Sequence, residues 1–261
     1  MTTVSTVITY EVASPATLVL QVAAVHAAEE NLTVDGAGDA PVEVLPGTAG
    51  GRQHVVRVPP GTLTVRYAAT IRSAPAPPPV GAAERVEALR PSRYCPSDRV
   101  AGLARSLFRG KADPAERVAA VCDHVRGEIV YAPGCSGPST DGVETLLAGE
   151  GVCRDFAHVV AMLCRAVDVP ARVASVYAPG LSPMDLHAVA ETELDGQWWV
   201  WDATGLAPRQ TLARIATGRD AADTAFVSVL SGEAALQGLE VMAVASGRLP
   251  GDDHQGPVQL P

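Results

Sequence analysis

The chain has 261 residues, of which 47% are hydrophobic and 19% are charged, a composition typical of a folded protein rather than a disordered one. The formal net charge of -9 disfavours binding to nucleic acid or to an anionic membrane surface. No apolar run reaches the roughly 18 residues that a membrane span requires, and no secretion signal is visible at the start. The 5 cysteines are too few for a disulfide scaffold. We therefore expect a reduced, cytoplasmic protein of one large or two modest domains.

The first 72 residues predict a β domain, because short segments rich in valine and threonine alternate with turns of glycine, proline and aspartate. Strands are expected at 4–12, 18–26, 42–45, 55–58 and 63–69. Several short strands with such turns favour an antiparallel sandwich. The proline-rich run at 73–79 is typical of a stiff spacer that cannot join a sheet. We therefore place a linker at 73–90 between domains at 1–72 and 91–246.

After the linker, apolar residues recur with the period of helices. A capping box at 113–116, with proline at the first helical position, begins one helix. A second box at 141–144 begins a short helix that Gly149 ends. A third helix begins near Val152 and ends before Pro170. Strands are expected at 171–178, 186–194, 197–203, 226–230 and 239–245, followed by a loose polar tail at 247–261.

Cys153 lies in the first turn of the third predicted helix, after Gly151 and Val152. The unpaired N–H groups and the dipole of a helix N-terminus stabilise an anion, so a thiolate is favoured there. Most free cysteines are small buried hydrophobic residues, and position alone leaves that interpretation open. Cys153 is therefore a candidate nucleophile that needs partners elsewhere in the chain.

The pair Asp195-Gly196 is a strong signal for a two-residue hairpin turn between two neighbouring strands. With the register that this turn sets, the two-residue period of a strand places His187 and Asp202 on one face as diagonal neighbours. In this arrangement a carboxylate orients a histidine that acts as a general base. A register slip of one residue would separate the two side chains.

Three motifs resemble the core signature of the transglutaminase-like superfamily of papain-fold cysteine enzymes: Gly151-Val-Cys-Arg-Asp-Phe-Ala157, Leu186-His-Ala-Val-Ala-Glu191 and Trp199-Val-Trp-Asp-Ala-Thr204. The resemblance runs from about Arg90 to Leu230 and extends to a bacterial branch commonly labelled as cysteine proteases. Two positions depart from the usual pattern. An alanine follows the histidine where an aromatic residue is common, and Ala203 replaces a frequent proline.

The resemblance implies an α+β fold in which the nucleophile begins a helix packed on an antiparallel sheet, with an N-terminal β-sandwich domain. It also implies a triad in which Cys153 attacks, His187 is base and then acid, and Asp202 orients His187. The Cys153 backbone N–H would hold part of the oxyanion. Tyr131 is a candidate for the second donor, but the favoured interpretation is a tyrosine that only packs in a strand.

The expected activity is cysteine-dependent hydrolysis of a protein or peptide substrate at peptide or isopeptide amides, through a thioester acyl-enzyme. One alternative is a protein-glutamine transglutaminase that passes the acyl group to an amine. Another is an inactive fold that serves as a binding module. We expect neither a cofactor nor a metal, because the histidines and cysteines lack the CxxC or HExxH spacing of zinc sites and no Rossmann or P-loop motif occurs.

Overall fold

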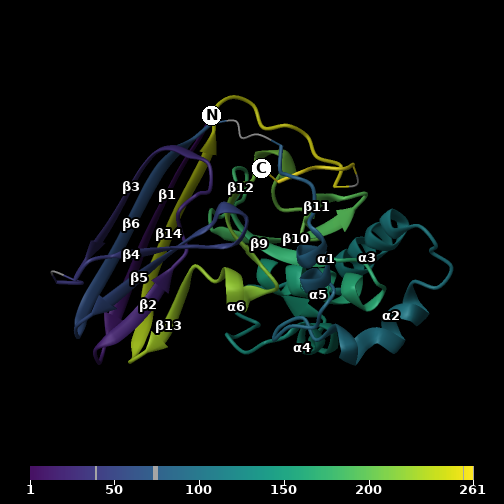
Figure 1. Cartoon of the computed structure of the whole chain (residues 1–261), viewed down its shortest axis with the longest axis horizontal. Helices are drawn as coiled ribbons and strands as arrows, with labels where there is room; N and C mark the ends of the chain where they lie inside the picture. The colour runs from purple at the N-terminus through teal and green to yellow at the C-terminus, as the bar shows by residue number, and fades with distance from the viewer. Residues whose placement is uncertain (39, 73–75, 255, 261) are drawn as a thin grey trace.

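In the computed structural model, which describes residues 1–38, 40–72, 76–254 and 256–260, two antiparallel sheets pack face to face and form the sandwich half of the molecule (Figure 1). Its strands are β1 (Thr2–Val12), β2 (Ala16–Leu20), β3 (Ala27–Asp35), β4 (Glu43–Pro46), β5 (Arg52–Val58), β6 (Gly61–Ile71), β13 (Val227–Ser231) and β14 (Ala234–Ala245), with a short 3-10 turn, η1 (Thr48–Gly50), before β5. One sheet has the order β14-β1-β6-β3 and the other the order β13-β2-β5-β4. Alternate side chains, such as Ile8 and Leu18, are fully buried between the sheets.

The last two strands belong to this sandwich, although the sequence predicted a separate unit at 91–246. β14 pairs with β1 along its length, from Ala245 opposite Thr2 to Ala234 opposite Val12, and β13 pairs with β2. Without these partners β1 and β2 would be edge strands with unpaired backbone groups. Pairing between strands from the two ends of the chain leaves no local signal in the sequence. The strand pairing therefore corrects the predicted domain at 91–246: its last two strands, β13 and β14, belong to the sandwich.

The helix–sheet half (residues 82–224) is built around α5 (Cys153–Ala166). This helix lies on an antiparallel sheet of order β11-β10-β9-β12, made by β9 (Ala171–Tyr177), β10 (Leu186–Leu194), β11 (Gln197–Trp201) and β12 (Ala213–Gly218). All residues of α5 from Asp155 to Ala166 are buried, because α3 (Pro114–Glu128) and α4 (Gly142–Ala148) also pack against it. The remaining elements are α1 (Ala82–Ala88), η2 (Ser97–Val100), α2 (Ala101–Leu107), β7 (Val130–Tyr131), β8 (Glu150–Gly151), η3 (Arg209–Thr211) and α6 (Ala221–Thr224).

The predicted capping residues begin the helices that lead to the site. The Asp113 side chain accepts a hydrogen bond from the backbone of Ala115 at the start of α3, one residue after Pro114. Asp141 and Glu144 form the reciprocal capping box of α4. Gly149 ends α4 with a φ of 70°, a conformation that favours glycine. The chain then passes through β8 directly into α5.

The predicted linker and tail are more ordered than the sequence indicated. Residues 73–75 of the expected linker lie outside the described residues, but its second part forms α1, whose Glu84 accepts a hydrogen bond from the Trp198 indole at 2.9 Å. In the tail, Leu260 is fully buried and Asp252 forms an ion pair of 2.8 Å with buried Arg209. Residues 255 and 261 lie outside the described residues, and for the described part of the tail these contacts correct the expectation that it is loose.

The two halves share packed side chains where β9 and β12 face the sandwich. The Tyr177 hydroxyl lies 2.7 Å from the Thr6 hydroxyl and donates to the Val22 carbonyl at 2.8 Å. Ala213 and Ile215 of β12 pack into the core of the sandwich. The sandwich therefore supports the sheet that carries the candidate site.

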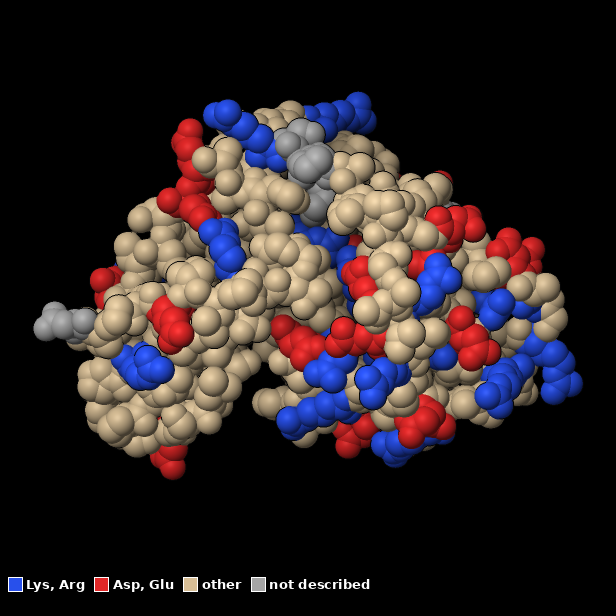
Figure 2. Space-filling view, viewed as in Figure 1, with Lys and Arg blue, Asp and Glu red and all other residues tan. Residues whose placement is uncertain are grey.

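Charged side chains are unevenly distributed over the molecule. Figure 2 shows them gathered on the helix–sheet half, whereas the visible face of the sandwich is mostly uncharged. None of the described helices is both long and apolar enough to cross a membrane.

Candidate active site

Cys153 is the first residue of α5, and its thiol is half-buried. The predicted helix start is thus confirmed. The Sγ atom lies 4.0 Å from the carbonyl oxygen of Leu186, the first residue of β10. This contact brings the start of the helix to the start of the strand that carries His187.

The hairpin of β10 and β11 has the register that the two-residue turn predicts. Glu193 lies opposite Trp198 and Leu194 opposite Gln197. Asp195 and Gly196 both have positive φ angles, 53° and 78°, as a type I′ turn requires. The hairpin consequently carries the next residue after β11, an aspartate, back toward the start of β10.

His187 and Asp202 meet as the register predicts. His187 Nε2 lies 2.8 Å from Asp202 Oδ2, and both side chains are almost completely buried. The other carboxylate oxygen of Asp202 accepts hydrogen bonds from the backbone N–H of Thr204 at 2.9 Å and from its hydroxyl at 2.6 Å. Asp202 is therefore held in place on both of its oxygens.

The charges of this pair stabilise each other. Burial by itself lowers the pKa of His187, but the Asp202 carboxylate and the Cys153 sulfur oppose that effect, and the net pKa is raised. Burial raises the pKa of Asp202, but His187 and the hydrogen bonds from Thr204 outweigh it, and the net pKa is lowered. The favoured state is therefore an imidazolium beside a carboxylate.

Asp202 occupies Nε2 of the imidazole and leaves Nδ1 for another group. Nδ1 has no hydrogen-bond partner among the described residues. The nearby Cys153 side chain adds to the effect of Asp202 and raises the pKa of the ring. The imidazole is thus paired with a carboxylate through one nitrogen and lies near the Cys153 thiol.

Tyr131, the further candidate residue, lies near the nucleophile. β7 runs parallel to β8, with Tyr131 opposite Gly151. Burial first, and then the nearby Cys153 sulfur, raise the pKa of the Tyr131 phenol to about 12, and the Cys153 backbone offsets only part of that effect. Tyr131 therefore remains protonated at neutral pH, with a proton to donate.

The sequence analysis did not single out Asp155, although this residue is fully buried two positions after Cys153. Its backbone position, the third in the helix, is where a capping carboxylate is expected. An acidic residue three positions after the N-cap residue Val152 is the sequence signal that could have identified Asp155.

Among the described residues, no group of three or more His, Cys, Asp or Glu side chains is arranged to hold a metal ion.

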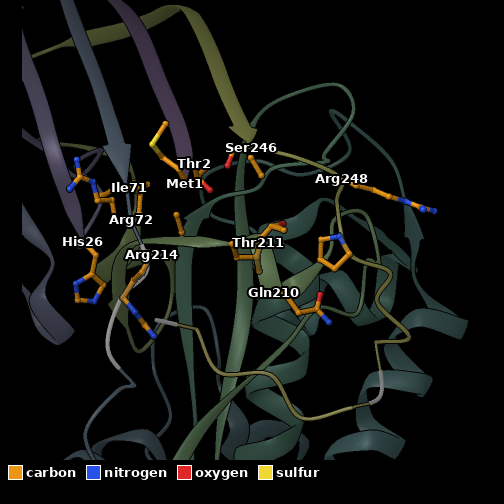
Figure 3. A pocket seen from close by; sticks show the side chains of 15 residues that line it. Met1, Thr2, His26, Ile71, Arg72, Gln210, Thr211, Arg214, Ser246 and Arg248 are labelled. Atoms are coloured by element: carbon orange, nitrogen blue, oxygen red, sulfur yellow. The ribbon is translucent and has the colours of Figure 1, made fainter.

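A cavity of about 410 Å³ lies between the two halves of the molecule, away from this site. Figure 3 shows side chains around it that include His26, Arg72, Gln210 and Arg214. Cys153, His187 and Asp202 are not among its lining residues. The candidate site is therefore at the start of α5 rather than in this cavity.

Comparisons with known proteins show what this chain is similar to. The family model of the transglutaminase-like superfamily matches residues 101–203. A crystal structure of a "Putative Cysteine Protease" from Cytophaga hutchinsonii is 31% identical and covers 98% of this chain and 94% of that one, with a TM-score of 0.88. An uncharacterized protein of Mycobacterium leprae (strain TN) is 29% identical over 151 residues. That match spans about half of each protein, 53% of this chain and 53% of the relative.

Proposed function

Since the chain belongs to the transglutaminase-like superfamily, we propose that it is a cysteine-dependent amide hydrolase that cleaves peptide or isopeptide bonds. The proposed nucleophile is Cys153, the base and then acid is His187, and Asp202 orients His187. One observation carries this proposal: a buried imidazole is paired with a carboxylate and lies near the thiol at the start of α5, and both neighbours raise its pKa. In the proposed mechanism His187 takes the proton of the Cys153 thiol, and the sulfur becomes the nucleophile.

In the first half of the proposed reaction the Cys153 sulfur attacks the carbonyl carbon of the amide, and the C=O electron pair moves onto the oxygen. The Cys153 backbone N–H donates to this oxyanion, and the Tyr131 hydroxyl, which lies near Cys153 and keeps its proton, is the second donor. The electron pair then re-forms the C=O bond as the C–N bond breaks. His187 gives the proton on Nδ1 to the leaving amine, which departs and leaves a thioester on Cys153.

In the second half a water molecule attacks the thioester, and His187 Nδ1 takes one of its protons. The C–S bond breaks, the acid is released, and the thiolate and imidazolium are restored. Asp202 holds Nε2 throughout, so Nδ1 is the position that gains and loses the proton.

The direct test is incubation with a peptide library in the presence of a labelled primary amine, followed by mass spectrometry. A hydrolase produces unlabelled acids and new amino termini, whereas a transglutaminase attaches the label to the acyl product. We expect hydrolysis that Cys153→Ala abolishes and that Cys135→Ala, which removes another half-buried free thiol, leaves unchanged. Label incorporation in place of hydrolysis would overturn the assignment in favour of a transglutaminase.

A chemical test distinguishes an enzyme from an inactive binding module. We expect iodoacetamide to alkylate Cys153 at least about tenfold faster than Cys135 at pH 7, because only Cys153 has an imidazolium beside it. His187→Ala should remove this advantage. Equal rates for the two thiols in the wild-type protein would contradict the proposal and favour a binding module.

A further inference from the structure

Asp155 connects three pieces of chain that surround the nucleophile. Its Oδ2 atom accepts hydrogen bonds from the Val152 backbone N–H at 2.9 Å and from the Ser136 hydroxyl. Its Oδ1 atom accepts from Nε and Nη2 of Arg154, at 3.0 and 2.8 Å. The residue before Cys153, the residue after it and the loop between β7 and α4 are thereby tied to one carboxylate.

The space around this carboxylate is closed by Gly151. A Cβ atom at Gly151 would lie 2.8 Å from the Asp155 Cβ and 3.1 Å from the Thr145 Cγ2, closer than side chains normally approach. Any larger residue would push β8 away from the first turn of α5. The absence of a side chain at Gly151 therefore lets β8 pack closely against Asp155 in the first turn of α5.

The hydrogen bond to Val152 determines how α5 begins. Val152 is the N-cap residue, and its side chain has no acceptor for the free N–H groups of the first turn. Asp155 accepts the N–H of Val152 itself from the third helical position. This bond fixes the backbone of the residue directly before the nucleophile.

The negative charge of Asp155 is balanced by the neighbouring Arg154 guanidinium. Arg154 pairs with it and also donates to the Gly137 carbonyl at 2.9 Å, on the same loop as Ser136. A carboxylate in the first turn of a helix is in addition stabilised by the helix dipole. Asp155 therefore has no free acceptor with which to take a proton from a substrate.

We propose that Asp155 is a positioning residue for the nucleophile. It holds the 151–153 backbone against the Ser136 loop, so that the Cys153 sulfur meets His187 and the Cys153 N–H faces the oxyanion. This inference rests on the proposed function. Its expected size is large, because a displacement of about 1 Å of a reacting group costs on the order of 100-fold in rate.

The test is Asp155→Asn, which keeps the size of the side chain but replaces one acceptor oxygen with an NH2 group that faces a donor. We expect kcat to fall on the order of 10- to 100-fold with KM within about twofold. We also expect alkylation of Cys153 by iodoacetamide to slow at least about fivefold. The matched control is Asp220→Asn, another buried carboxylate that accepts from two backbone N–H groups, at Tyr94 and Ala222. It should lower the unfolding midpoint without changing the alkylation rate.

A folded Asp155→Asn variant with the kcat and the alkylation rate of the wild type would overturn the inference. If that variant does not fold, Ser136→Ala decides, because it removes one donor to Asp155 and leaves α5 intact. We expect a two- to fivefold lower kcat, on the scale of one lost hydrogen bond, in a folded protein whose unfolding midpoint falls only slightly. An unchanged kcat would refute the positioning role. Failure of the proposed function gives a different result from failure of the positioning role alone. If the proposed function is wrong, wild-type Cys153 reacts no faster than Cys135, and the positioning role is then refuted as well.

Discussion

His187 Nε2 and Asp202 Oδ2 lie 2.8 Å apart across a hairpin whose turn is only two residues long. The distance follows from the register of β10 and β11, which the turn sets. Because both side chains are buried, water does not screen the attraction between an imidazolium and a carboxylate here. The pair is thus both an orienting contact for the imidazole and a source of pH-dependent stability.

Asp202→Asn tests the orienting contact. We expect kcat for amide hydrolysis to fall by about 100-fold or more, because an amide allows the ring to flip or to take the wrong tautomer. The measurement is kcat on a cleaved peptide, together with the alkylation rate of Cys153. A matched control is Asp123→Asn, an exposed carboxylate near Arg126 on α3 that should leave kcat unchanged. A kcat within threefold of the wild type in Asp202→Asn would show that the carboxylate has no catalytic role.

Tyr131→Phe tests the second oxyanion donor. The hydroxyl is lost while the ring that packs against Phe156 remains. We expect kcat to fall by about tenfold or more with KM nearly unchanged, since the contact forms only with the oxyanion. Val130→Ala, an exposed neighbour on the same strand, serves as the control. A higher KM at constant kcat would instead indicate a role in substrate binding.

The His187–Asp202 pair makes stability depend on pH in a definite direction. The raised pKa of His187 adds stability that is complete below its ordinary value of 6.5 and is lost as the pH rises through the raised value. The lowered pKa of Asp202 adds stability above its ordinary value of 3.8, which is lost as the pH falls through the lowered value. We expect the difference in the free energy of unfolding between wild type and His187→Gln to be largest from about pH 4 to 6.5. Urea denaturation at pH 5, 7 and 9 measures it, and a difference that does not shrink at pH 9 would contradict the paired state.

Glu191→Gln tests a buried ion-pair cluster on β10, the strand that carries His187. Fully buried Glu191 accepts from Arg172 at 2.7 Å and from Arg214 at 2.8 and 2.9 Å. Burial raises the pKa of Glu191, but the two guanidinium groups outweigh it and lower the pKa to about 2. Removing the charge should cost about 3–5 kcal/mol in the free energy of unfolding, because Arg172 and Arg214 lose the buried carboxylate that they share.

The control for this variant is Glu43→Gln, whose exposed pair with Arg57 at 3.9 Å should contribute less than about 1 kcal/mol. Both variants are measured by urea denaturation at neutral pH. Equal effects of the two substitutions would mean that burial does not strengthen the cluster on β10.

Local rules predicted the elements that carry the candidate site. The capping residues Asp113 and Asp141 begin α3 and α4, and the period of apolar residues after Val152 predicts α5. The hairpin turn predicts the register that joins His187 to Asp202. Each of these signals lies within a few residues of the structure that it specifies, so a single sequence contains it.

Contacts between distant segments were not predictable in the same way. α1 forms inside the expected linker because Glu84 reaches Arg172 and Trp198 in the sheet. The tail is ordered because Leu260 enters a core made by other strands. No periodicity or turn residue encodes which surface will be available to such a segment.

The sequence by itself determined that a cysteine begins a helix and that a histidine and an aspartate share a hairpin face, because capping and turn chemistry act over short distances. Only the tertiary structure decided that β14 joins β1, that Tyr131 lies near Cys153, and that Asp155 packs closely against Gly151. These relationships depend on which surfaces meet when the chain collapses. They arise from burial and hydrogen-bond satisfaction over the whole chain, which no local pattern records.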